Sequence, residues 1–200
     1  MNNFSRIRQQ LLASDPVLAP IISHIGTRKL SVSKNPFLDL AEAIINQQLS
    51  EKAGRTIFLR FRALFPNKRV TPGLLLLKPD QELRSAGISG AKAGYLKALA
   101  GAVSDKTLVL NSLSPKTDEE VIMSLTAVKG IGRWTAEMFL MFSLGREDVF
   151  SYGDLGLRRA IQMLYRMKRE PTVRQLERLS GRWKPYRTFV ALALWNFKDG

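Results

Sequence analysis

Residues 117–142 read TDEEVIMSLTAVKGIGRWTAEMFLMF, and this stretch decides which kind of fold the chain forms. Thr117 followed by three acids is typical of a helix start, where such side chains cap and complement the free N–H groups. Gly130 and Gly132 then interrupt the chain, and a second apolar helical pattern starts at Arg133. The stretch therefore predicts two helices joined by a tight turn, a helix-hairpin-helix over about 117–144.

The turn of this hairpin, from Lys129 to Arg133, offers a place for an anion. Glycine accepts backbone dihedrals that other residues resist, and it lets a bulky group approach the main chain. The first N–H groups of the second helix have no intrahelical partner and lie at the positive end of its dipole, which suits phosphate. Ile131 can point inward and pin the turn to the core. The alternative is a tight turn that binds nothing.

The charge of the chain favours a polyanionic partner. Its 200 residues include 31 Lys and Arg against 17 Asp and Glu, a net charge of 31 − 17 = +14. The basic residues recur along the chain, at Arg55, Arg60, Arg62, Lys92, Lys97, Arg158, Arg159, Lys184 and Arg187. A folded basic face of this kind indicates nucleic acid first and an acidic membrane surface second. A merely basic soluble protein is the alternative.

Several classes of site and location are excluded or disfavoured. The chain has no cysteine, which excludes disulfides, thiolate zinc sites, iron–sulfur clusters and cysteine nucleophiles. Its one histidine, His24, is expected to be an ordinary residue at a helix end. No apolar run is long enough to span a membrane, and the start of the chain lacks the apolar core of a signal peptide. We expect a soluble intracellular protein, cytoplasmic in a prokaryote or nuclear in a eukaryote.

The rest of the chain also has helical periodicity, so we expect an all-α fold. Asn35 and Ser50 are expected N-caps. The predicted helices cover about 36–45, 50–65, 72–77, 80–87, 89–103, 133–145, 154–167, 171–179 and 185–197. Residues 107–113, TLVLNSL, form a short strand, a loop or a short helix. We expect two helical lobes around a cleft, with 64–73 and 110–117 as candidate crossings between them.

Asp154 lies 22 residues after Gly132, directly before an apolar helical repeat. A carboxylate in that place can cap the helix, and the main-chain N–H groups that it accepts keep it ionised. One interpretation is a cap and nothing more. The other is a functional anion held across a cleft from the phosphate seat. For Asp148, capping or exposure to solvent is the expectation.

Residues 125–161, LTAVKGIGRWTAEMFLMFSLGREDVFSYGDLGLRRAI, resemble the helix-hairpin-helix DNA glycosylases that carry a Gly-Pro-Asp region. The likeness is closest to their alkylation-repair branch, 3-methyladenine DNA glycosylase II. It extends to AIINQQLSEKAGRTIFLRF at 43–61, AGISGAKAGYLKALA at 86–100 and RWKPYRTFVALALW at 182–195, and spans about 36–197. The resemblance implies an all-α fold with two interleaved lobes in one domain, residues 1–200.

The resemblance also implies roles for main-chain groups. The hairpin would bind a DNA phosphate through the N–H groups of Lys129, Gly130, Ile131, Gly132 and Arg133. The carbonyl groups of Thr126, Val128 and Gly130 match positions that hold a structural monovalent cation in relatives. No other cofactor is expected.

Five side chains match functional positions of the family. Asp154 matches the catalytic aspartate, and Trp134 and Trp195 match aromatic positions near the base pocket. Gln48, with Leu49, falls where relatives insert a wedge into the duplex. Core packing is the alternative for the tryptophans, including Trp183, and an exposed helix end is the alternative for Gln48.

Two departures from the family pattern bear on the chemistry. Trp134 stands where lyase-type relatives carry a lysine, so the amine needed for a Schiff base with the sugar is missing. Gly153 stands where some relatives have a second acid. The missing amine predicts a monofunctional glycosylase that leaves an abasic site. The resemblance implies that it removes purines of the 3-methyladenine and 7-methylguanine type from double-stranded DNA, and we expect a monomer. The alternatives are a non-catalytic hairpin DNA-binding protein and a glycosylase of the same fold for oxidised or deaminated bases.

Overall fold

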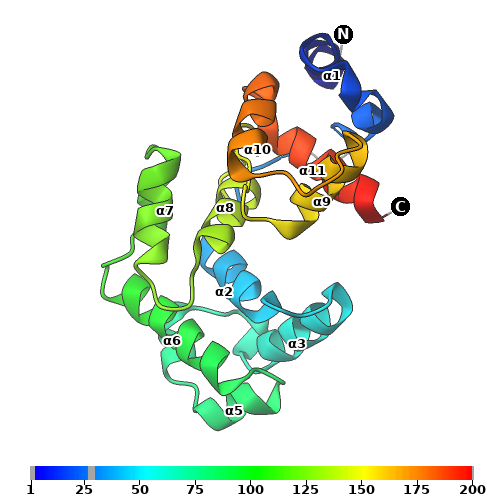
Figure 1. The fold of residues 1–200 in the computed structure, drawn as a ribbon. Coiled ribbons are helices and arrows are strands. Elements are labelled where there is room, and N and C mark those ends of the chain that lie inside the picture. Colours follow the sequence, from blue (N-terminus) through cyan, green and yellow to red (C-terminus); the bar gives the residue numbers. More distant parts are fainter. Residues whose placement is uncertain (1–2, 27–29, 200) are drawn as a thin grey trace. The chain divides into compact units, whose positions relative to one another are not determined.

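The computed structural model describes residues 3–26 and 30–199, and within these ranges the regular elements are all helices (Figure 1). The all-α prediction is confirmed. Residues 107–113 contain the short 3-10 helix η3 (Leu110–Ser112), so the strand considered for them is wrong. None of the helices in the described ranges is long and apolar enough to cross a membrane.

The chain forms two compact units that interleave in sequence. The first unit combines Met1–Val32 with Gly145–Gly200, and the second is Ser33–Leu144. The chain therefore passes between units near residues 32 and 145, and the crossings expected at 64–73 and 110–117 are wrong. Those two stretches are loops inside the second unit, where they join successive helices and carry η2 (Pro66–Lys68) and η3.

The second unit contains seven α-helices, most of which start at a side chain that caps them. They are α2 (Pro36–Asn46), α3 (Glu51–Ala63), α4 (Pro72–Leu76), α5 (Asp80–Ser85), α6 (Gly90–Ser104), α7 (Asp118–Thr126) and α8 (Arg133–Phe142). The predicted caps are confirmed, because Asn35 accepts from the N–H of Leu38 and Ser50 from that of Ala53. Thr117 and Glu120 form a capping box on α7.

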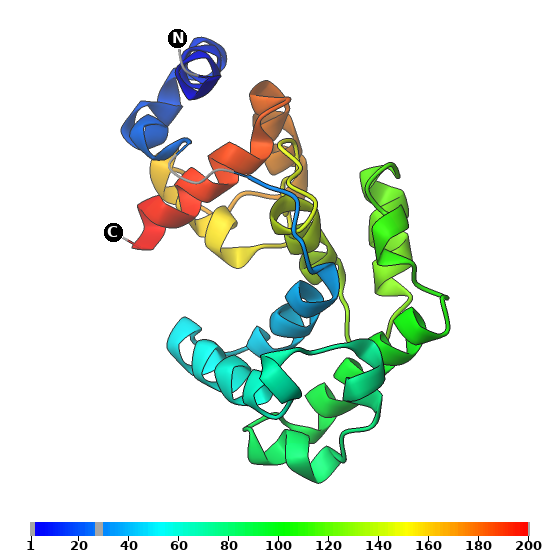
Figure 2. The ribbon, with the colours of Figure 1, turned by 180° about the vertical axis from the view of Figure 1, so that it is seen from behind.

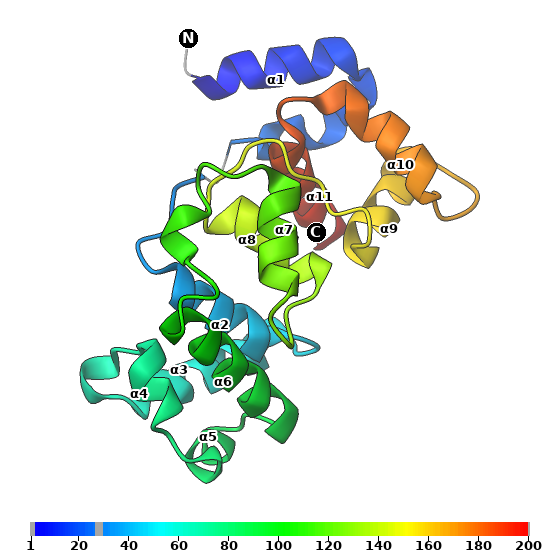
Figure 3. The same ribbon diagram turned by 90° about the vertical axis from the view of Figure 1, so that its left-hand side faces the viewer.

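Helix α2 packs against α3, α6 and α8, so it lies in the middle of the second unit. Its buried face consists of Phe37, Leu40, Ala41, Ile44 and Ile45. Helix α8 is buried along most of its length, from Thr135 to Met141. Helices α4 and α5 both pack on α6, as Figure 3 shows. The hairpin and the loop after α2 therefore rest on one shared core.

The first unit brings both ends of the described chain together. It contains α1 (Asn3–Ser14), η1 (Pro16–His24), α9 (Leu155–Leu164), α10 (Val173–Ser180), η4 (Gly181–Trp183) and α11 (Arg187–Asp199). Helix α11, red in Figure 2, packs on α9 and on η1. Helix α1 contacts η4. His24 is the last residue of η1, which confirms the expected helix-end position.

A buried carboxylate joins these N-terminal and C-terminal helices. Asp15 caps η1 through the N–H of Val17 and is fully buried. The hydroxyl of Tyr165 and the indole N–H of Trp183 both donate to its Oδ2. Trp183 itself is fully buried, so it is a core residue. Burial, and then the contact with Asp15, raises the pKa of Tyr165, so the hydroxyl keeps its proton at neutral pH.

Candidate active site

The hairpin turn between α7 and α8 has the strained backbone that its glycines suggested, but at one glycine only. Gly130 has φ +94, in the region that favours glycine. A Cβ at Gly130 would lie 2.2 Å from Cγ of Tyr95 in α6, so the ring of Tyr95 covers the turn from one side. Ile131 is 4% exposed, and its predicted role of pinning the turn to the core is confirmed.

Gly132 has a different reason to lack a side chain. Its φ of −92 and ψ of 171 suit any residue, so the expectation of a special conformation is wrong at this position. It is the N-cap of α8, which no side chain of the described residues caps. A Cβ at Gly132 would meet no heavy atom of the described chain within 4 Å beyond its immediate neighbours. Space for an external group, and not backbone strain, distinguishes Gly132.

The basic side chains on either side of the turn, Lys129 and Arg133, differ in whether they form ion pairs. Lys129 is exposed and forms no ion pair with the described residues. The guanidinium of Arg133 instead binds Glu119 of α7 at 2.6 Å and Glu137 of α8 at 3.1 Å. The hydrogen bond to Glu119 raises the pKa of Arg133. The side chain of Arg133 thus joins the two helices of the hairpin, while Lys129 faces solvent.

Two of the three carbonyl groups expected to hold a cation already accept a hydrogen bond. The carbonyl of Val128 accepts from the N–H of Ile131 at 3.1 Å. The carbonyl of Gly130 accepts from the side-chain amide of Gln47 at 2.9 Å. Each carbonyl oxygen has a second lone pair, so both remain able to bind a cation together with Thr126.

Asp154 is the N-cap of α9, as its place in the sequence predicts. Its Oδ1 accepts the N–H of Leu157 at 2.7 Å and the indole N–H of Trp195, in α11, at 3.2 Å. Gly156 lies under this pair of bonds: a Cβ there would stand 3.0 Å from the same Oδ1 and 3.5 Å from the Trp195 ring. The carboxylate is held by two helices and is crowded on the side of Gly156.

The three tryptophans have three different environments. Trp183 is in the core of the first unit. Trp195 is half-buried in the same unit and binds Asp154, so it positions the carboxylate in addition to any contact with a base. Trp134 is 44% exposed on the first turn of α8 in the second unit. A single exposed apolar side chain is not by itself a sign of a site, but the exposed ring of Trp134 is accessible to a ligand.

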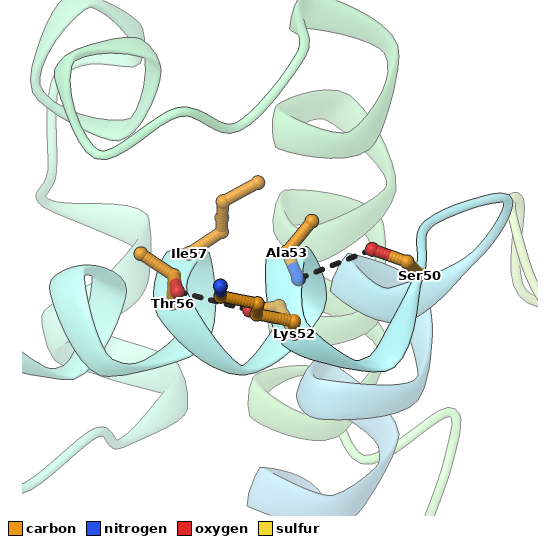
Figure 4. A pocket seen from close by; sticks show the side chains of 5 residues that line it. All are labelled: Ser50, Lys52, Ala53, Thr56 and Ile57. Carbon is orange, nitrogen blue, oxygen red and sulfur yellow. Dashed lines mark hydrogen bonds between the residues drawn. The ribbon is translucent and has the colours of Figure 1, made fainter.

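The wedge loop, residues 47–50, joins α2 to α3. Gln48 is exposed and has φ +57, and Leu49 is 37% exposed. Ser50 then starts α3, as Figure 4 shows, with its hydroxyl accepting from the N–H of Ala53. Lys52 and Thr56 follow on the exposed side of α3, beside an open pocket of about 380 Å³. The two expected wedge residues thus lie together at the tip of a short loop.

A family model matches this chain over residues 41–185, which include the wedge loop, the hairpin and Asp154. The model describes the HhH-GPD superfamily of base excision DNA repair proteins. The chain belongs to this superfamily.

Individual HhH-GPD relatives agree with this assignment. The chain is 33% identical over 181 residues to DNA-3-methyladenine glycosylase 1 of Schizosaccharomyces pombe, covering 90% of this chain and 79% of that protein. The structure of an S. pombe 3-methyladenine DNA glycosylase in complex with abasic DNA is similar, with a TM-score of 0.86, 32% identity and coverage of 96% and 95%. A DNA-3-methyladenine glycosidase from Bacillus halodurans gives a TM-score of 0.81, 39% identity and coverage of 95% and 88%.

In this HhH-GPD chain, the sequence did not predict the contacts of four residues near the candidate site. They are Gln47, Lys92, Tyr95 and Gly156. The first three contact the wedge loop or the hairpin from far along the chain, and no local pattern marks such contacts. Gly156 had a signal, because a glycine inside the first turn of a helix is unfavourable unless space is needed there.

Asp148 forms more contacts than the expected capping or exposure to solvent implied. It accepts from the main-chain N–H of Arg187 at 3.4 Å, which agrees with a capping role at the start of α11. It also binds the guanidinium of Arg187, with Nε at 2.7 Å. Arg187 further donates to the hydroxyl of Tyr152 at 3.2 Å. The start of α11 therefore holds the segment that leads to Asp154.

Proposed function

We propose that this chain is a DNA glycosylase that removes alkylated purines, of the 3-methyladenine and 7-methylguanine type, from double-stranded DNA. It acts by hydrolysis, leaves an abasic site and functions as a monomer. The observation that carries the proposal is the carboxylate of Asp154, held at the start of α9 by N–H groups of Leu157 and Trp195. The names of the similar proteins support the same substrate class.

Asp154 supplies the electrostatics of bond cleavage. As the N-glycosidic bond breaks, its electron pair leaves with the base and positive charge develops on the sugar. An ionised carboxylate beside the sugar stabilises that charge and can orient the water that adds to C1′. A purine methylated at N3 or N7 carries a positive charge and leaves as a neutral base, so it needs little help from a general acid. One carboxylate is sufficient for this reaction, and Gly153 is therefore compatible with it.

The hairpin binds the DNA backbone in this proposal. The uncapped N-terminus of α8, the open space at Gly132 and the exposed Lys129 together suit a phosphate group. Main-chain N–H groups contact phosphate in the same way at any sequence, so this grip is independent of sequence. The wedge residues Gln48 and Leu49 would fill the gap that an extruded base leaves, because the target base must leave the stack to react.

We propose that aromatic side chains recognise the methylated base. A methylated purine is electron-poor, and the face of an indole attracts such a cation by about 0.5–2 kcal/mol. Trp134 has an exposed ring, and Trp195 adjoins Asp154. Trp134 also occupies the position where a lysine would form a Schiff base with the sugar, so we infer that the chain has no lyase activity.

The proposed cation at the hairpin would bind the carbonyl oxygens of Thr126, Val128 and Gly130. These donors are neutral, which suits a monovalent ion. By neutralising the negative ends of three carbonyl dipoles, such a cation would strengthen the positive potential at the turn. We propose that this cation stabilises the turn and takes no part in the chemical reaction.

The test uses methylated genomic DNA and the purified protein. Released bases are separated by chromatography, and the DNA is then analysed for strand breaks before and after alkali. The proposal expects free 3-methyladenine and 7-methylguanine, with strand breaks only after alkali. Release of oxidised or deaminated bases alone would assign a different substrate, and tight DNA binding without any release would assign a non-catalytic protein. Strand breaks before alkali would contradict the monofunctional reaction.

A further inference from the structure

The wedge loop is joined to the turn of the hairpin by one side chain. The amide nitrogen of Gln47 donates to the carbonyl of Gly130 at 2.9 Å and lies 3.4 Å from the hydroxyl of Thr135. Gly130 is the left-handed residue of the turn, and Thr135 belongs to the first turns of α8. The residue directly before Gln48 therefore contacts the turn and the helix after it.

Lys92 joins the same loop to α6. Its Nζ donates to the carbonyl of Ile45 at 2.8 Å and to that of Gln47 at 2.6 Å. Carbonyl groups at the end of α2 lack intrahelical partners, and a cation there is favoured by the helix dipole. Burial lowers the pKa of Lys92. Tyr95, one turn further along α6, covers Gly130, so one helix supports both the wedge loop and the hairpin turn.

These two contacts fix the chain directly before a residue in an unfavourable conformation. Gln48 has φ +57, a left-handed backbone conformation that is unfavourable for a residue with a side chain. On its other side the N–H of Leu49 donates to the carbonyl of Asn46 at 3.1 Å, and Ser50 caps α3. With both neighbours fixed, Gln48 is held at the tip of the loop.

We propose that Gln47 and Lys92 are positioning residues that couple the wedge to the phosphate anchor. The inference rests on the proposed function and deepens it. A phosphate bound at the hairpin fixes the turn, the carbonyl of Gly130 fixes Gln47, and Gln47 fixes the residue that enters the duplex. Binding of the backbone and filling of the gap are then one event. Without the link, the hairpin still binds DNA, but Gln48 relaxes and the wedge enters less often.

The test measures binding and wedge entry separately on one uncleavable probe. The probe is a duplex with a tetrahydrofuran abasic analogue and a neighbouring 2-aminopurine, whose fluorescence rises when it is unstacked. Fluorescence anisotropy gives the Kd, and the fluorescence at saturation reports wedge entry. The proteins are wild type, Gln47→Leu, Lys92→Met and the control Gln81→Leu, which alters an exposed glutamine of α5 in the same unit.

We expect Gln47→Leu to keep its Kd within about threefold of wild type, because the phosphate contacts remain. At saturation, the increase in 2-aminopurine fluorescence should be about five to ten times smaller than with wild type, because one hydrogen bond that holds the loop is lost. Lys92→Met should behave in the same way, and Gln81→Leu should match wild type. Where Gln47→Leu melts at a lower temperature than the control, Gln47→Asn replaces it, because its amide is one methylene too short to reach Gly130.

Three results would overturn the coupling. One is an undiminished fluorescence rise in both variants. Another is a loss of affinity that parallels the loss of fluorescence, which indicates a general structural role. The third is the absence of any rise with wild type, since no wedge then enters. The probe needs no base release, so these results are independent of the methylated-DNA experiment that decides the proposed function.

Discussion

Among the groups that contact the carboxylate of Asp154 are N–H donors from two different helices. Leu157 lies three residues further along α9, and Trp195 lies in α11. Gly156 leaves room for this arrangement, since a Cβ there would approach Oδ1 to 3.0 Å. The candidate chemistry therefore depends on the Asp154 side chain, on the donors Leu157 and Trp195, and on the absence of a Cβ at Gly156.

Replacing Gly156 by alanine tests the importance of that space. Alanine favours a helix over glycine by about 0.5–1 kcal/mol, so Gly156→Ala should fold at least as stably as wild type. The added methyl pushes on the carboxylate and on Trp195, and we expect about a tenfold slower single-turnover release of 7-methylguanine. Quenched-flow assays and thermal melts check the two parts. A wild-type rate in a stably folded Gly156→Ala protein would contradict the positional account.

Residue-level prediction from the sequence succeeded where the signal was local. Asp154 could be predicted as an N-cap because a cap and the helix it starts are adjacent in the chain. The bond from Trp195 spans 41 residues, and no spacing rule links an indole in one helix to a cap in another. The ion pair of Arg133 with Glu119 spans 14 residues and is likewise not specified by any local pattern. Its ion pair with Glu137 is an i,i+4 pair on α8, which helical spacing does indicate.

At the scale of elements, the hairpin has two glycines with two different tasks. Gly130 provides the left-handed turn and the contact with Tyr95. Gly132 has an ordinary conformation and an open side at the uncapped end of α8. The motif thus separates the residue that shapes the turn from the residue that leaves room for a ligand.

The two glycines should therefore respond differently to alanine. Gly132→Ala should fold like wild type and bind every duplex more weakly, by about fivefold or more, because the methyl group intrudes only on a bound phosphate. Gly130→Ala should lower the melting temperature, because it combines a positive φ with a clash against Tyr95. Melting curves and binding to several unrelated duplexes check both. A loss at Gly132→Ala confined to one DNA sequence would count against the phosphate seat.

Elements with local start signals were predicted, and their mutual contacts were not. Asn35, Ser50 and Thr117 all cap helices as expected, since each signal lies within three residues of the N–H that it binds. The tie from Gln47 to Gly130 spans 83 residues. Such a contact depends on how α2 and α8 pack, which the periodicity of either helix does not specify.

At the scale of the molecule, the first unit is assembled from the two ends of the chain. Asp15 joins η1 to the residues after α9 and to η4, through Tyr165 and Trp183. The sequence suggested loops rich in proline and polar residues as crossings between the two lobes. The chain passes between the two units near residues 32 and 145 instead. The prediction failed because a composition rich in proline and polar residues indicates a turn but does not specify which elements the turn connects.

Loss of Asp15 should weaken the first unit. Asp15→Ala leaves the buried indole N–H of Trp183 and the hydroxyl of Tyr165 without their acceptor. We expect a loss of about 2–4 kcal/mol in the free energy of unfolding. Urea denaturation followed by tryptophan fluorescence measures it, with Glu147→Ala, at an exposed acid of the same unit, as the matched control. Equal midpoints for the two variants would contradict the central role of Asp15.

One substitution tests most directly whether Asp154 carries the chemistry of base removal. Asp154→Asn keeps a side-chain oxygen able to accept from Leu157 and Trp195, but it removes the negative charge. Wild type and variant are incubated with methylated genomic DNA, and released 3-methyladenine is quantified by chromatography, with binding to abasic DNA measured in parallel. We predict that the variant binds abasic DNA and releases almost no 3-methyladenine. Release at the wild-type rate would contradict the account.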